Sequence, residues 1–154
     1  MDIASIQFIV REVWPVAYKE MITQQQINYM LDMMYSDESL KAQMLVDGCE
    51  FILAKEENSV VGFAGFQKTA EGVFKLHKLY VLTSQQGKGI GKMLLDEVCV
   101  RSKNGGGISL ELQVNKKNIA RKFYEKNDFV VERELQLDIG NGFVMDDYIM
   151  RKML

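Results

Sequence analysis

Apolar residues recur at helical spacing through the first third of the chain, ahead of any segment with the alternation typical of a strand. The spacing predicts a first helix over residues 3–21, and Pro15, which has no backbone N–H group, predicts a break or kink near Trp14. Residues typical of helix starts predict two further helices. Thr23 followed by Gln26 indicates the start of a helix that runs to Tyr35, and Ser36 or Asp37 indicates the start of a short helix near Leu40.

From residue 50 onward, short stretches alternate or run apolar, which is typical of strands. The predicted order is a hairpin over 50–55 and 60–67, a strand over 74–82, a helix over 90–103, a strand over 108–114, a helix from about 118, and a last hairpin over 130–139 and 143–150. Helices followed by strands, with further helices between the strands, indicate an α+β fold. The 154 residues, without a repeat or a low-complexity tract, are expected to form one domain, residues 1–154.

Composition narrows the possible classes of function. The formal net charge is −2 and the lysines are spread along the chain, so nucleic acid is not an expected partner. No apolar run reaches the length of a spanning helix and the amino end lacks a signal-peptide pattern, so we expect no membrane partner and a cytoplasmic protein. Cys49 and Cys99 lack metal-ligand spacing and the chain has one histidine, so no metal is expected, and both cysteines are predicted to be buried thiols.

The segment between Val81 and Met93 carries most of the information about function. Val81 is expected to end a strand and Met93 to be the first core residue of the next helix, and between them lie Gln86, Gly87, Lys88, Gly89, Ile90 and Gly91. The first N–H groups of a helix have no partner within it and the helix dipole is positive at that end, so a pyrophosphate binds there. Glycine permits positive φ and close approach of phosphate oxygens, while Lys88 and Lys92 add positive charge.

Two common nucleotide-binding motifs do not fit this turn. A P-loop needs glycine five residues before Gly91 and a hydroxyl residue after Lys92, and the chain has Gln86 and Met93 at those positions. The dinucleotide motif G-x-G-x-x-G also fails, because Gly87 and Gly89 lead to Lys92. These mismatches argue against a nucleoside triphosphatase and a dinucleotide enzyme, and a glycine-rich turn without a ligand stays as an alternative.

The remaining pattern, Q-x-x-G-x-G from Gln86 to Gly91, resembles the [RQ]-x-x-G-x-[GA] motif with which the GCN5-related N-acetyltransferase (GNAT) family binds the pyrophosphate of acetyl-coenzyme A. Residues 114–129 resemble a second element of that family, N-x-x-A-x-x-F-Y-x-x-x-G-F, with matches at Ala120, Phe123, Tyr124 and Phe129 and with Asn118 one position after the asparagine of the pattern. Asp128 stands where the family has glycine. That position commonly needs a left-handed backbone, which Asp and Asn tolerate better than most residues.

The resemblance implies the family's α+β fold, a mixed, mostly antiparallel sheet flanked by helices, with the family's first strand either missing or upstream of Met1. It implies acetyl-coenzyme A as co-substrate, held by Gln86, Gly87, Lys88, Gly89, Ile90, Gly91 and Lys92, by Asn118 on the pantetheine arm, and by backbone amides from Leu79 to Val81. Tyr124 is then the acid that protonates the departing thiolate.

A base must take a proton from the acceptor, because a primary ammonium with a pKa near 10 has no lone pair for attack. His77 stands where many members of the family carry glutamate, and histidine titrates near neutrality, so His77 is the candidate base. An ordinary strand histidine is the alternative for this residue. Glu111, another carboxylate, or no dedicated base also stay open for the proton transfer.

The family usually binds its acceptor between the first two helices and the last hairpin. Those segments supply Trp14, Tyr18, Tyr29, Met33 and Met34 on one side and Asp146, Asp147 and Tyr148 on the other. Aromatic rings with carboxylates suit a cationic amine, so a polyamine or similar small amine is expected, in line with a resemblance of residues 27–36 and 140–150 to PaiA-like acetyltransferases. Core methionines and a solvated Asp146–Asp147 turn are the alternatives for these residues. A protein amino terminus or lysine as acceptor, a non-catalytic binding module, and a homodimer through exposed edge strands also stay open.

Overall fold

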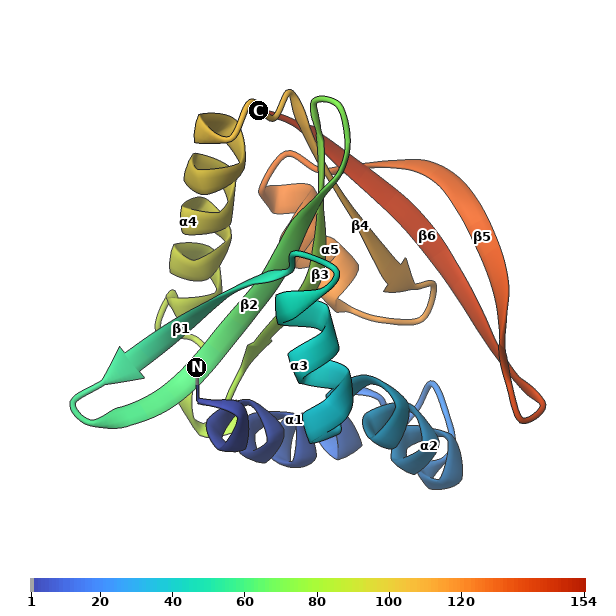
Figure 1. Cartoon of the computed structure of the whole chain (residues 1–154). Coiled ribbons are helices and arrows are strands. Elements are labelled where there is room, and N and C mark those ends of the chain that lie inside the picture. Colours follow the sequence, from blue (N-terminus) through green and yellow to red (C-terminus); the bar gives the residue numbers. More distant parts are fainter. Residues whose placement is uncertain (1) are drawn as a thin grey trace.

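The computed structural model describes residues 2–154, which form a six-stranded sheet with helices on both faces (Figure 1). In chain order the elements are α1 (Ile3–Ala17), α2 (Gln24–Tyr35), α3 (Asp37–Leu45), β1 (Glu50–Glu56), β2 (Ser59–Ala70), β3 (Val73–Val81), a short 3-10 turn (Thr83–Gln85), α4 (Ile90–Asn104), β4 (Ser109–Asn115), α5 (Ala120–Lys126), β5 (Val130–Gly140) and β6 (Phe143–Met153). The predicted order of helices and strands is confirmed.

The strands lie in the order β1-β2-β3-β4-β6-β5. Every neighbouring pair is antiparallel except β3 and β4, which are parallel because α4 connects them. The sheet is therefore mixed and mostly antiparallel, and the predicted α+β class is confirmed. The first element of the described residues is α1.

The sheet opens at its centre, between β3 and β4. The parallel pairing begins at Val73 with Ser109 and stops at Leu76 with Leu112, although β3 continues to Val81 and β4 to Asn115. Beyond that point the two strands diverge, as Figure 1 shows. The facing edges of β3 and β4 therefore carry backbone N–H and C=O groups with no partner from the neighbouring strand, and such groups need another partner where they are not in water.

A bulge in β3 begins at the same place. Gly65 of β2 pairs with Lys78 while the next residue, Phe66, pairs with Leu76, so His77 is the extra residue. An extra residue reverses which face of the sheet the following side chains occupy. As a result Leu76 and Leu79 both pack against the core under α4, whereas Tyr80 packs on the opposite face.

Each face of the sheet has its own hydrophobic core. On one face, α4 contributes Leu94, Leu95 and Val98, all at most 3 % exposed, and Phe123 and Tyr124 of α5 pack against the same cluster. On the other face α1, α2 and α3 bury a cluster that includes Trp14 and Phe63. The prediction that Met93 is the first core residue of α4 is wrong. Met93 is 66 % exposed, because one residue along a helix rotates the side chain by about 100° and the core stripe begins at Leu94.

Of the break or kink predicted near Trp14, the break is absent, since α1 continues through Pro15 to Ala17. Pro15 lies in the last turn, where the helix ends two residues later, and the Tyr18 N–H group closes that turn onto the Trp14 carbonyl at 3.0 Å. Pro15 removes one backbone donor, and only two more helical residues follow it, so α1 ends short of the predicted Met21. The predicted starts of α2 and α3 are confirmed, because Thr23 accepts from the Gln26 N–H group and Ser36 from the Ser39 N–H group.

Two further predictions concern the cysteines and membrane-spanning helices. Cys49 is a buried free thiol as predicted, but Cys99 is only half-buried on α4, so the prediction of two buried thiols is wrong for Cys99. Among residues 2–154, no helix combines the length and hydropathy needed to cross a lipid bilayer.

Candidate active site

The turn after β3 presents free backbone donors at the start of α4. Gly87 has φ 82° and Gly89 has φ 81°, so both lie in the left-handed region that favours glycine, and Gly89 caps the helix. The first helical hydrogen bond runs from the Met93 N–H group to the Gly89 carbonyl at 3.0 Å. The N–H groups of residues 87–92 have no acceptor within residues 2–154. This is the arrangement that binds an anion at a helix amino end.

The two lysines of the turn differ in their surroundings. Lys88 donates to the Gln85 side chain at 2.7 Å and lies 3.8 Å from a Glu56 carboxylate oxygen, so its ammonium has partners within the chain. Lys92 forms an exposed ion pair with Asp96 at 2.8 Å, yet it also lines the hollow beside the turn. Lys92 therefore lines the hollow next to the turn, whereas Lys88 does not line it.

A hollow of about 690 Å³ lies against this turn. It runs from the turn residues along β3 to the start of α5, and its walls include Gln86, Gly87, Gly89, Ile90, Gly91 and Lys92 with Leu79, Val81, Asn118 and Tyr124. A second cavity, of about 370 Å³, lies where β3 and β4 diverge, under α1 and α2. The two cavities meet at the opening in the sheet, because they share the lining residues Val13, Ala17, Leu79, Val81, Gln86, Asn118, Ala120 and Tyr124.

Tyr124 stands at this junction. Its ring packs edge-on against Phe123 and Phe129, with ring centres 5.4 and 5.6 Å away, which fixes its orientation. The hydroxyl makes no hydrogen bond to any other described residue. Burial, with a smaller contribution from Tyr18, raises the pKa of Tyr124 well above its usual value, so the phenol keeps its proton at neutral pH.

Asn118 and Asp128 fix the two ends of α5. The Asn118 side-chain oxygen accepts from the Ala120 N–H group at 2.8 Å, which leaves its amide NH₂ group available on the cavity side. Asp128 adopts φ 71°, so the left-handed conformation predicted for the position where the family has glycine is present. Asn127 supports this end of the helix by donating from its side chain to the Phe123 carbonyl at 2.8 Å.

The 370 Å³ cavity has a mixed aromatic and polar wall. Of the predicted acceptor contacts, Trp14, Tyr18, Met34 and Asp147 line it. The others lie elsewhere: Tyr29 donates to the Ile139 carbonyl, Met33 is exposed, Asp146 pairs with Lys116, and Tyr148 lies beside Lys116 and Arg121. Sequence reasoning missed Gln26, Lys78 and Gln113, which also line this cavity.

A family model described as an acetyltransferase (GNAT) domain matches residues 18–150 of this chain. The chain belongs to the GNAT acetyltransferase family. Its fold agrees with this membership. The chain superposes with a TM-score of 0.83 on the structure of the PaiA N-acetyltransferase from Thermoplasma acidophilum in complex with coenzyme A. The two chains are 28 % identical, and the match covers 99 % of this chain and 93 % of that one. The family assignment makes the protein an enzyme, an acetyl-CoA N-acetyltransferase.

Two characterised relatives are similar to this acetyltransferase in sequence. A spermidine N(1)-acetyltransferase from Thermoplasma acidophilum is 27 % identical over 150 residues, which cover 94 % of this chain and 90 % of the relative. A ribosomal protein bS18-alanine N-acetyltransferase from Haemophilus influenzae is 36 % identical over 74 residues, which are 48 % of this chain and only 50 % of that relative's length. The names of the two relatives specify different acceptors, spermidine and the alanine of a ribosomal protein.

His77 of this acetyltransferase lies in the β3 bulge and lines the 370 Å³ cavity. Its side chain keeps an exposed side, yet desolvation, followed by the positive charges of Lys75 and Lys78, lowers the pKa of His77 to about 4. The imidazole is therefore neutral at physiological pH and has a free lone pair, but the lowered pKa also makes His77 a weaker base than an ordinary histidine.

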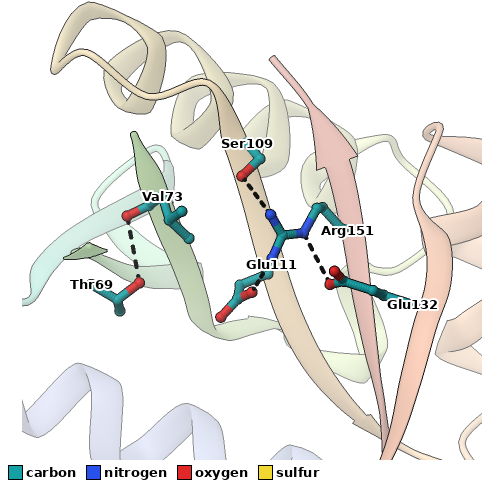
Figure 2. A network of polar contacts seen from close by, with 6 residues as sticks. All are labelled: Thr69, Val73, Ser109, Glu111, Glu132 and Arg151. Atoms are coloured by element: carbon teal, nitrogen blue, oxygen red, sulfur yellow. Dashed lines mark hydrogen bonds and ion pairs between the residues drawn. The ribbon is translucent and has the colours of Figure 1, made fainter. Parts of the chain in front are cut away.

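Glu111, the alternative base, lies outside both cavities of the acetyltransferase. Figure 2 shows it on β4 beside Arg151, whose guanidinium lies 3.1 Å from Glu111 and 3.0 Å from Glu132 of β5 and donates to the Ser109 hydroxyl. Arg151 thus joins β4, β5 and β6 through paired charges. Glu111 has a structural partner, and nothing in its surroundings directs it to the opening in the sheet.

Proposed function

We propose that this protein transfers an acetyl group from acetyl-coenzyme A to the primary amine of a small molecule, a polyamine or similar amine, by direct attack on the thioester. The observation that carries the proposal is the meeting of two cavities at Leu79 and Tyr124, in the gap between β3 and β4. One cavity borders the turn with free amides, which suits the coenzyme, and the other is lined by α1, α2 and the last hairpin, which suits a small acceptor.

The coenzyme's pyrophosphate is assigned to the N–H groups of Gly87 to Lys92, with Gln86, Lys88 and Lys92 at the sides of the turn. The pantetheine arm then runs along the unpaired edge of β3 at Leu79 and Val81, which supplies the partners that an added strand would otherwise give. The free NH₂ group of Asn118 faces the same path. The coenzyme-bound PaiA structure, similar over 99 % of the chain, supports this assignment.

The chemistry follows from the groups at the junction. The amine nitrogen, once deprotonated, forms a C–N bond to the thioester carbonyl while the C–S bond breaks. Tyr124 holds a phenolic proton beside the expected sulfur position and gives it to the leaving thiolate, and the proton lost by the attacking nitrogen replaces it. His77, neutral and at the cavity wall, is the proposed acceptor of the proton that the ammonium first releases. No step of the proposed reaction uses a metal.

We infer a small acceptor from the size and walls of the second cavity. The 370 Å³ space is walled by Trp14, Tyr18 and Met34 on the helix side and by Asp147 on the sheet side. The relative named for spermidine is similar over nearly the whole chain, and it favours a small amine. A protein amino terminus is the second candidate, favoured by the 36 % identity to the bS18-alanine acetyltransferase over half of its length. In either case the chain acts as one cytoplasmic acetyltransferase domain, alone or as a homodimer.

The test is release of free coenzyme A from acetyl-coenzyme A, measured with a thiol reagent, in the presence of polyamines, aminoglycosides, amino acids or short peptides. The proposal predicts turnover with small amines and little with peptides. Turnover with peptides alone would move the assignment to a protein acceptor. If calorimetry showed coenzyme binding without turnover of any acceptor, the protein would instead be a non-catalytic binding module.

A further inference from the structure

Gln113 of β4 lies beside the opening in the sheet, on the acceptor side. Leu112 and Val114 face the core under α4, so strand alternation turns Gln113 to the opposite face, where it lines the 370 Å³ cavity. The β3–β4 pairing ends one residue earlier, at Leu112. On β3 the first residue beyond the pairing is His77, which lines the same cavity. Gln113 and the proposed base His77 therefore stand on the two strands where the opening begins.

A buried carboxylate fixes the side-chain amide of Gln113. Asp147 of β6 is 1 % exposed, and its Oδ2 atom accepts from the Gln113 side-chain NH₂ group at 2.7 Å. The other oxygen of Asp147, Oδ1, is enclosed and has no hydrogen-bond partner among residues 2–154. A carboxylate accepts and an amide nitrogen donates, so this contact decides which end of the Gln113 amide faces β6.

The oxygen of the same amide is left without a donor. Gln113 Oε1 accepts no hydrogen bond from the described part of the chain, and, unlike Asp147 Oδ1, it is not fully enclosed by the protein. The amide group is planar, so the contact that holds its nitrogen also holds its oxygen. Gln113 therefore presents a fixed hydrogen-bond acceptor to the cavity that it lines.

Two nearby carboxylates are not available to an amine at the opening. Glu111, two residues earlier on the same face of β4, binds Arg151 at 3.1 Å (Figure 2). Asp146, the neighbour of Asp147 on β6, binds Lys116 at 2.9 Å. Neither Glu111 nor Asp146 lines the cavity, whereas Gln113 does.

We infer that Gln113 binds the acceptor amine, its side-chain oxygen accepting a hydrogen bond from an N–H group of that amine, and that Asp147 positions the Gln113 amide for this contact. The inference rests on the proposed function and adds a binding residue to its acceptor site. An amide is not a base at neutral pH, so Gln113 orients the amine while the proton goes to His77, as in the proposed reaction. The lone pair of the amine stays free for the thioester carbon.

Substitution of the two residues, separately and together, tests these contacts by coenzyme A release with the most active amine of the acceptor panel. Gln113→Leu should lower kcat/KM for the amine about tenfold, the effect of one hydrogen bond to a charged group, and leave KM for acetyl-coenzyme A unchanged. Asp147→Ala frees the amide and should lower kcat/KM for the amine by no more than Gln113→Leu does. The double variant should match Gln113→Leu, because Asp147 acts through Gln113.

Two results would contradict these roles. Wild-type kcat/KM for the amine in a folded Gln113→Leu protein would overturn the binding role of Gln113. A double variant about tenfold worse than Gln113→Leu would show that Asp147 acts on the amine independently, and a folded Asp147→Ala protein that loses stability but keeps kcat/KM would show that Asp147 is only structural. Either outcome would overturn the positioning role.

The double variant also guards against failure to fold. Gln113→Leu leaves the Asp147 carboxylate buried without a donor, which costs stability for that reason alone. The double variant removes this carboxylate, so it tests the role of Gln113 where the single variant does not fold. Asp146→Ala is the control, because Asp146 is adjacent in sequence but binds Lys116 outside the cavity, and it should keep kcat and both KM values.

Failure of the inference and failure of the proposed function give different results. If amines are acetylated equally well without Gln113, the inference fails and the proposed function stands. If no amine is acetylated, the proposed function fails, and binding of 1,4-diaminobutane and spermidine to the coenzyme A complex then tests the inference. Trp14, the single tryptophan of the chain, lines the cavity and reports occupancy by its fluorescence. Binding that Gln113→Leu weakens about tenfold supports the inference, and equal or absent binding overturns it.

Discussion

Replacing Gly89 by alanine separates the backbone's role in coenzyme binding from its role in stability. Gly89 has φ 81° and a Cβ atom built there meets nothing within 4 Å, so the only cost to the fold is the left-handed conformation. For an L-residue that cost is about 1–2 kcal/mol, a fraction of the ~5–15 kcal/mol that stabilises a domain of this size. The Gly89→Ala protein should therefore fold.

Coenzyme binding should suffer more. Relief of the strain rotates the peptide groups around Gly89, and the N–H groups of Ile90 and Gly91 then no longer point at one site. One hydrogen bond to a charged group contributes about 1.5–3 kcal/mol. At about 1.4 kcal/mol per tenfold, its loss raises the dissociation constant for coenzyme A roughly 10- to 100-fold.

Gly142 provides the matched control. It lies in the turn between β5 and β6 at φ 77°, and a Cβ atom there also meets nothing within 4 Å. Gly142→Ala should lose the same stability in urea unfolding as Gly89→Ala but keep wild-type affinity for coenzyme A by calorimetry. Wild-type affinity in a folded Gly89→Ala protein would refute the assignment of the pyrophosphate to this turn, and so would an equal loss of affinity in the Gly142→Ala protein.

Three further substitutions address catalysis and stability. Tyr124→Phe removes the proposed acid, so kcat should fall roughly tenfold to a thousandfold while coenzyme affinity stays unchanged, and an unchanged kcat would remove Tyr124 from the mechanism. Because the pKa of His77 is lowered to about 4, a rate that depends on neutral His77 should fall only as the pH drops through about 4. His77→Ala should abolish this acidic limb of the pH–rate profile. An acidic limb that persists in the variant points to another base. Leu95→Ala, at a fully buried site of α4, should lower the free energy of unfolding by about 2–5 kcal/mol. Val100 is 54 % exposed on the same helix, so Val100→Ala should change the free energy of unfolding by less than about 0.5 kcal/mol. Equal effects of the two substitutions in urea unfolding would contradict the described core.

Local signals were sufficient for much of the fold. Thr23 and Ser36 marked helix starts because a cap depends on only a few neighbouring residues. The turn from Gln86 to Gly91 was predictable for the same reason, since its free amides and positive φ angles follow from glycines within one short segment. The left-handed conformation of Asp128 was predictable from its position after α5.

The acceptor side was harder to predict, because it depends on which face of a strand each residue occupies. Asp146 and Asp147 are adjacent and look equivalent in sequence, yet strand alternation sends one to Lys116 at the surface and the other into the cavity. The bulge at His77 has the same effect on Lys78, which a regular strand would have placed on the opposite face. Register and bulges are set by pairing between distant segments, and the sequence pattern of β3 alone does not reveal them.

The most direct test of the central claim is a crystal structure of the protein with acetyl-coenzyme A. The account predicts the pyrophosphate within hydrogen-bond distance of the N–H groups of Gly87 to Lys92, and the thioester between β3 and β4 beside Tyr124. A coenzyme bound elsewhere, or a thioester that lies away from the opening where the β3–β4 pairing ends at Leu76 and Leu112, would contradict it.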